Sequence, residues 1–226
     1  MDVTTSGSGA GSPARARGRG RLNDRAYDYL RDGIMRGTFP TGSVLAESEL
    51  ARTLDSSRMP VRQALGRLLQ EGLLEVGPRR QLIVRGFTPE HRAEILLLRE
   101  SLESLALARA CDVMNVDDID WLRLLLIRQH RAAVDGREND FLDLDEEFHL
   151  KIVEGAQLPI LYGLLGQLRG FVRVARLGAR RPPAVLEQVV AEHRDIVDAL
   201  EARNVDDAVE ALRKHLRKSD YAIAAS

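Results

Sequence analysis

The feature that most restricts the fold is a pair of helical segments separated by only a few residues in the N-terminal third of the chain. The stretch reads "LAESELARTLDSSRMPVRQALGRLLQEGLL". A short helix is predicted from about Glu47 to Leu54, followed by a break at "DSS" and a second, longer helix. Two helices joined by so short a turn are typical of a helix-turn-helix.

The second helix of the pair is specified by its own residues. Ser57 is suited to the N-cap, and Pro60 falls in the first turn, where its missing N–H costs little. The core stripe at helical spacing consists of Val61, Ala64, Leu65 and Leu68. Arg58 and Arg62 lie outside this stripe, at the end of a recognition helix that reaches base edges and phosphates in the DNA major groove.

Flanking segments extend the pattern to a winged helix-turn-helix over residues 22–86. Before the helix pair, "LNDRAYDYLRDGIMRGTF" predicts one amphipathic helix, whose apolar face is formed by Leu22, Ala26, Tyr29, Leu30, Ile34 and Met35. After Gly72, "LLEVGPRRQLIVRGF" predicts two short strands around a turn at Gly77 and Pro78. The alternative to DNA binding is a solvated basic surface on a small helical domain, formed by Arg58, Arg62, Arg67, Arg79 and Arg80.

Charge is divided unevenly along the chain. Residues 1–85 hold 14 Lys and Arg against 9 Asp and Glu, whereas residues 86–226 hold 19 against 25. The net charge of −1 therefore combines +5 and −6, which favours an N-terminal part that binds nucleic acid and a different role for the rest. Residues 1–21 are rich in Gly, Ser and Ala and lack the apolar core of a signal peptide, so we expect a disordered basic tail.

Residues 88–226 are expected to form an all-α helical bundle. Helices are predicted at about 89–110, 117–134, 138–154, 159–178, 184–202 and 205–223. The single cysteine, Cys111, excludes an intrachain disulfide and a thiolate metal site, and it favours a reducing cytoplasmic setting. No apolar run reaches the roughly 20 residues that span a bilayer, so no membrane is expected among the partners.

Four side chains of the bundle have the spacing of a metal site. His193 and His215 lie about ten residues before and about eleven residues after the turn between the last two helices, so an antiparallel hairpin places them at the same level. On an earlier helix, Asp145 and His149 lie one turn apart on one face. Three imidazoles and one carboxylate suit a divalent metal ion, for which zinc is expected, with nickel and manganese as alternatives. The histidines without such partners are His91 and His130.

The N-terminal motifs resemble a known family. "SSRMPVRQALGRLLQEGLL" resembles the recognition-helix signature of the GntR family of bacterial transcription regulators, and "LAESELARTL" resembles that family's second helix. Asp55 stands at the turn where the family usually has Gly. The resemblance implies DNA contacts by Ser48, Ser57, Arg58, Arg62, Arg67, Arg79 and Arg80.

The C-terminal motifs resemble the FCD ligand-binding domain of the fatty-acid-regulator subfamily of GntR proteins. They are "LRESLE", "DEEFH", "EHRDIVDAL" and "AVEALRKHL". The resemblance implies a divalent metal held by Asp145, His149, His193 and His215. It also implies that Arg99 meets a carboxylate effector, the alternative being a surface ion pair with Glu103 at i+4.

The sequence therefore predicts a mainly α protein with an N-terminal winged helix-turn-helix and a C-terminal, FCD-like helical bundle that also dimerises. The predicted function is a ligand-responsive transcription regulator, not an enzyme. It would bind an inverted-repeat operator as a homodimer and respond to an organic acid at the metal. The alternatives are a metal-dependent hydrolase, because an open metal position can activate water, and a regulator whose metal is purely structural.

Overall fold

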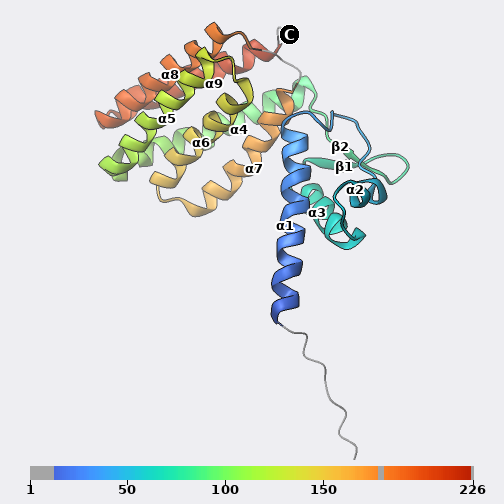
Figure 1. The fold of residues 1–226 in the computed structure, drawn as a ribbon. Coiled ribbons are helices and arrows are strands. Elements are labelled where there is room, and N and C mark those ends of the chain that lie inside the picture. Colours follow the sequence, from blue (N-terminus) through green and yellow to red (C-terminus); the bar gives the residue numbers. More distant parts are fainter. Residues whose placement is uncertain (1–12, 178–180, 225–226) are drawn as a thin grey trace, which may run out of the picture. The chain divides into compact units, whose positions relative to one another are not determined.

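The chain forms two units, each described here by itself. The computed structural model describes residues 13–177 and 181–224, with side-chain environments for residues 24–177 and 181–218. The units divide between Arg85 and Gly86, and Met35–Gly37 is grouped with the second. The first is a winged helix-turn-helix and the second is a helical bundle (Figure 1). The predicted fold class is thereby confirmed.

The first unit contains three helices and a two-stranded sheet among its described residues. They are α1 (Pro13–Met35), α2 (Glu47–Thr53), α3 (Arg58–Gln70), β1 (Leu74–Val76) and β2 (Leu82–Val84). Helix α1 begins at Pro13, so the predicted disordered tail is wrong for residues 13–21, where Ala and Arg are good helix formers. The rest of that predicted tail, residues 1–12, lies outside the described residues.

The core of the first unit lies where α1 and α3 present their apolar stripes. The predicted stripe of α3 is buried throughout, with Val61 and Leu68 fully inaccessible. In α1 one prediction is wrong, because Tyr29 is 40% exposed and Tyr27 is buried instead. The Tyr27 hydroxyl donates to the Glu71 carboxylate at 2.8 Å, and burial together with this bond raises the pKa of Tyr27 to about 12. The phenol thus remains a donor at neutral pH.

The turn between α2 and α3 is built on a residue in the left-handed region. Asp55 has φ 45°, its N–H donates to Arg52 O, and the N–H of Ser56 donates to Ala51 O at 2.9 Å. These two bonds form the motif that usually ends a helix with glycine. Asp tolerates this conformation better than most residues, so the turn keeps its geometry without the family's usual Gly.

We predict that Asp55→Gly raises stability by about 1 kcal/mol, because glycine adopts a positive φ without steric cost. Asp55→Ala should lower stability by a similar amount, since alanine lacks the tolerance of Asp for this region. Chemical unfolding of the full chain, read as the shift of the midpoint, measures both. Equal effects of Gly and Ala would contradict the assignment of strain to this residue.

The wing is a hairpin of β1 and β2. The strands are antiparallel, with Leu74 opposite Val84 and Val76 opposite Leu82. An isolated bridge from Val44 to Ile83 adds a third segment to the sheet. Arg79 and Arg80 lie exposed at the hairpin tip, as the sequence predicted.

The second unit is all-helical in its described residues. It contains α4 (Pro89–Val113), α5 (Val116–Val134), α6 (Glu138–Gly155), α7 (Pro159–Ala175), α8 (Pro183–Glu201) and α9 (Val205–Ala224). The predicted end of α7 at residue 178 lies outside the described residues. Helix α4 packs against α6, α7 and α9, helix α5 against α6 and α8, and α8 against α9. In the part of the chain that is described, no helix is both long and apolar enough to cross a membrane.

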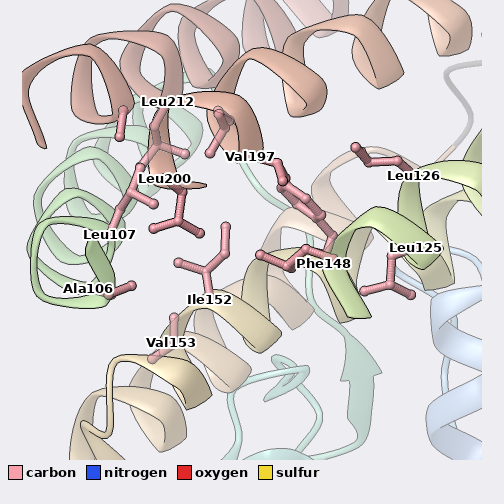
Figure 2. Close-up of a cluster of buried hydrophobic side chains, with 14 of the residues drawn as sticks. Ala106, Leu107, Leu125, Leu126, Phe148, Ile152, Val153, Val197, Leu200 and Leu212 are labelled. Carbon is pink, nitrogen blue, oxygen red and sulfur yellow. The ribbon is translucent and has the colours of Figure 1, made fainter. Parts of the chain in front are cut away.

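The core of the bundle joins side chains from most of these helices. Figure 2 shows Leu107 of α4, Leu125 of α5 and Ile152 of α6 pointing into the same cluster as Leu200 of α8 and Leu212 of α9. Burial of this apolar area is the main force that holds the helices in register. Because the helices are fixed by these contacts, polar side chains on their inner faces are brought to defined positions.

The turn between α8 and α9 is fastened by Arg203. This residue has φ 58° at the end of α8. Its guanidinium donates to Cys111 O at 2.7 Å and to Met114 O at 2.6 Å. These carbonyls belong to the C-terminal end of α4, where backbone acceptors lack helical partners. The α8–α9 hairpin is thereby tied to α4 at its turn.

Candidate metal centre and nucleic-acid interface

The bundle brings together the four side chains that the sequence selected as metal ligands. Asp145 and His149 come from α6, His193 from α8 and His215 from α9. All four are buried, and one ligand atom from each lies within 4.8 Å of the others. The one-turn spacing on α6 and the antiparallel packing of α8 and α9 produce this convergence.

The Nε2 atoms and one carboxylate oxygen face each other at the centre of the cluster. His193 Nε2 lies 3.3 Å from His215 Nε2 and 3.5 Å from Asp145 Oδ1. His149 Nε2 lies 3.8 Å from the same oxygen. Phe148 stacks on the His193 ring with centroids 4.1 Å apart, which limits the rotation of that imidazole.

The opposite ring nitrogens have acceptors that fix the tautomers of two histidines. Gln129 donates its amide N–H to Leu144 O, so its oxygen faces His193 Nδ1 at 2.9 Å and accepts from it. Glu192 Oε2 lies 3.0 Å from His215 Nδ1 and accepts likewise. A neutral ring with its proton on Nδ1 turns an unprotonated Nε2 toward the centre, as a metal ligand requires.

His149 is the third imidazole of the candidate metal centre. Its Nδ1 lies 2.7 Å from Glu103 Oε2, but the two groups are not aligned for a hydrogen bond, and Nε2 also lacks a hydrogen-bond partner among the described residues. Burial, and then the positive charge of Arg169, lowers the pKa of His149 to about 4. Burial and His215 hold the pKa of His193 well below its usual range. Both imidazoles are therefore neutral at pH 7.

The four residues fit a divalent metal ion. Two unprotonated nitrogens at 3.3 Å repel each other in a buried site unless a cation or a proton lies between them. Two ligands at about 2.0–2.1 Å from a tetrahedral zinc ion stand roughly 3.3 Å apart. The donor set of three imidazoles and one carboxylate also suits nickel and manganese.

Buried arginines surround the cluster. Arg169 donates to Asp145 Oδ2, and Arg176 lies 3.9 Å from the same oxygen. Burial would raise the pKa of Asp145, but the charges of Arg169 and Arg176 hold it well below its usual range. Arg99 donates to Glu103 at 2.7 Å. That pair is buried, so the alternative of a surface ion pair for Arg99 is wrong in its location.

A pocket opens beside the cluster. Its lining includes Asp145 and Glu192 together with the basic side chains of Arg176, Arg181 and Lys218. Several guanidinium N–H groups here have no hydrogen-bond acceptor among the described residues, namely Arg176 Nε and Nη2 and Arg181 Nη2. Buried donors without acceptors are costly. The pocket can therefore accommodate an anionic group that accepts from them.

All seven side chains predicted to meet DNA are exposed on the first unit. They are Ser48, Ser57, Arg58, Arg62, Arg67, Arg79 and Arg80. Ser57 occupies the N-cap of α3 but makes no capping hydrogen bond, which leaves its hydroxyl available. Arg67 lies over the Tyr27 ring at 3.7 Å and donates to Glu71, so like Arg62, which pairs with Glu47, it has partners within its own unit.

The sequence interpretation missed several polar residues of the centre. Gln129, Glu192, Arg169 and Arg176 were not selected, although each contacts a predicted ligand directly. One signal was present, since Arg169, Arg173 and Arg176 recur at helical spacing on the apolar face of α7. Arginine on a buried stripe needs an acid partner, which points to a charged interior.

A winged helix-turn-helix followed by a helical domain of this kind defines a two-domain transcription regulator. Residues 22–84 match the family described as bacterial regulatory proteins, gntR family, and residues 94–218 match the FCD domain. The chain therefore belongs to the GntR family and carries an FCD domain.

Individual relatives agree with this membership. The chain is 34% identical, over 87% of its length and 83% of the relative, to an HTH-type transcriptional regulator in an unstable DNA locus of Streptomyces ambofaciens. It is 26% identical, over 87% and 86%, to the HTH-type transcriptional repressor RspR of Escherichia coli. The solved structure of E. coli McbR/YncC superposes with a TM-score of 0.81 at 24% identity, covering 90% of this chain and 97% of that one. Because the family and these relatives are transcription regulators, the chain is a bacterial transcription regulator and not a metal-dependent hydrolase.

Proposed function

We propose that this regulator binds an inverted-repeat operator as a homodimer in the cytoplasm and changes its DNA affinity when an organic acid binds at a divalent metal. Residues 22–86 would read the operator, and residues 88–226 would hold the metal and the effector and form the dimer. The observation that carries the proposal is the convergence of three Nε2 atoms and Asp145 Oδ1 within a buried cluster. Zinc is the expected metal, with nickel or manganese as alternatives.

The pocket beside the cluster supports an effector over a purely structural metal. A divalent ion would add positive charge to a region where Arg176 Nε, Arg176 Nη2 and Arg181 Nη2 have no acceptor among the described residues. A carboxylate would accept from these guanidinium groups and occupy an open metal position. Arg99 pairs with Glu103 and is not among the residues that line the pocket, so its proposed part is to add positive charge near the effector.

An exposed apolar surface supports the homodimer. Helices α4 and α7 pack side by side, and they expose Leu97, Leu105, Ile160 and Leu164 by 65%, 59%, 83% and 53%. Exposed apolar side chains on neighbouring helices of a folded domain are typical of an interface. A second copy is the occupant we propose, because a two-fold protein matches an operator built from two half-sites.

The experiment that tests the function is a thermal-shift screen of the metal-loaded and the metal-stripped protein against small organic acids. A ligand that binds only the folded state raises the melting temperature. We expect a shift for at least one acid, only when metal is present, together with a change in operator affinity for the same acid. A metal-loaded protein that responds to none would favour the structural role. Sedimentation of the protein with and without DNA would report the number of chains, and a monomer in both would contradict the dimer.

We predict that Arg62→Ala weakens operator binding by about 1–3 kcal/mol while leaving binding to random DNA nearly unchanged. The reason is that Arg62 lies exposed near the start of α3, where a recognition helix meets base edges. Arg25→Ala on α1 removes the same charge from an exposed position and serves as the control. An equal loss on operator and random DNA would show that Arg62 contacts only phosphate.

A further inference from the structure

One ion pair connects the two helices of the helix-turn-helix, and it uses both oxygens of the Glu47 carboxylate. Arg62 Nε on α3 donates to Glu47 Oε2 on α2 at 2.9 Å, and Arg62 Nη2 donates to Glu47 Oε1 at 3.0 Å. The Arg62 side chain is nevertheless 66% exposed. Two other ion pairs of the unit are arranged differently: Arg67 pairs with Glu71 at i+4, and Arg85 pairs with Glu75 across the hairpin at 3.6 Å.

The contribution of such a pair to stability is small. An exposed ion pair adds little to the free energy of folding, because solvent screens the charges and two long side chains must be ordered. The pair also places a carboxylate beside the helix that faces DNA, where it repels phosphate. A residue that adds little stability and weakens general DNA affinity needs another explanation.

The geometry of the Arg62 guanidinium offers an explanation for the presence of Glu47. Its five N–H groups form two forked edges, and Glu47 occupies the edge made by Nε and one N–H of Nη2. The remaining edge, made by Nη1 and the second N–H of Nη2, has no acceptor among the described residues. That edge matches O6 and N7 of guanine in the major groove.

We propose that Glu47 is a positioning residue, which holds the Arg62 guanidinium so that its free edge reads a guanine in each operator half-site. The inference rests on the proposed role of Arg62 in reading DNA. Pre-ordering a side chain that has several rotatable bonds lowers the conformational entropy lost on binding. The negative charge of Glu47 also weakens binding to random sequence, so both effects increase specificity.

The test begins by selecting duplexes from a random-sequence pool with the wild-type full chain. Repeating the selection with Arg62→Ala identifies the base pair whose preference depends on Arg62. Affinities of wild type, Glu47→Gln, Arg62→Ala and the double variant are then measured at one salt concentration. The three duplexes are the selected one, the same one with guanine replaced by adenine at that base pair, and a scrambled one.

We expect Glu47→Gln to reduce the preference for guanine over adenine roughly fivefold, the lower end of the range for a bidentate base contact. Binding to scrambled DNA should strengthen, because one negative charge is lost. In the Arg62→Ala background, Glu47→Gln should reduce the preference no further. Glu49→Gln, on the same helix and exposed, removes the same charge and should raise affinity on all three duplexes without changing the preference.

The outcomes distinguish the proposed base contact of Arg62 from the proposed positioning role of Glu47. If Arg62→Ala retains the wild-type preference at every base pair, the proposed base contact is wrong and the role of Glu47 falls with it. If Arg62→Ala loses the preference but Glu47→Gln keeps it, the positioning role alone is overturned. Circular dichroism of each variant shows whether the fold is retained.

Discussion

The double variant His193→Ala, His215→Ala should lose stoichiometric divalent metal and the stabilisation that the metal confers. Two of the four ligands, from α8 and α9, are removed, and Asp145 with His149 leaves a bidentate site on one helix. At free metal about 100 times the dissociation constant, a bound ion stabilises the folded state by about 2.7 kcal/mol. That increment should vanish in the variant, and elemental analysis with thermal unfolding in metal or chelator measures it.

The two histidines outside the candidate metal centre, His91 and His130, provide a matched control. His91 exchanges capping hydrogen bonds with Thr88 at the start of α4, and His130 is exposed on α5. The variant His91→Ala, His130→Ala should therefore retain one ion per chain and its stabilisation, apart from a small loss at the cap. A His193→Ala, His215→Ala protein that still carries stoichiometric metal would place the site elsewhere.

Replacing Arg169 with methionine should destabilise the metal-free bundle by about 3–5 kcal/mol. Arg169 is buried and donates to Asp145 Oδ2, while Glu103 keeps a bond from Arg99. Without Arg169 the Asp145 carboxylate loses its hydrogen-bonded partner, and Arg176 at 3.9 Å compensates its charge only in part, so most of the lost stability comes from Asp145. Urea unfolding in the presence of a chelator measures the loss.

A second substitution distinguishes this cause from lost packing. The double variant Arg169→Met, Asp145→Asn no longer carries the Asp145 charge, so part of the stability that Arg169→Met removes from the metal-free bundle should return. Arg128→Met breaks an exposed pair with Glu147 at 3.8 Å and should cost less than about 1 kcal/mol. If Asp145→Asn adds to the loss, the interpretation of Arg169 as a charge partner is wrong.

Features that depend on chain-local chemistry could be predicted from the sequence. The stripe of α3 followed from its spacing, and the ends of the later helices from their Pro, Gly and Asn–Asp signals. The register of His193 and His215 followed from counting outward from one turn. Metal binding and the DNA contacts remain predictions, with which the geometry of the two sites is compatible.

Features that depend on which helix faces pack together could not be predicted in this way. The orientation of Gln129 toward His193 depends on the rotation of α5 against α8. In the core of the first unit Tyr27 is buried where Tyr29 was predicted, and this depends on the bond from Tyr27 to Glu71, which is remote in sequence. In each case the deciding partner lies on another helix, so periodicity within one element cannot identify it.

Because Arg203 ties the α8–α9 turn to the end of α4, the number of residues after this turn determines which way the His215 side chain points. Because an α-helix turns by about 100° per residue, one residue added between Asn204 and His215 would rotate the His215 side chain away from His193. The anchored turn leaves no slack to absorb that rotation. Relatives that keep the centre and this anchor should therefore hardly vary in the number of residues between the two histidines, whereas the exposed positions of the hairpin are free to differ.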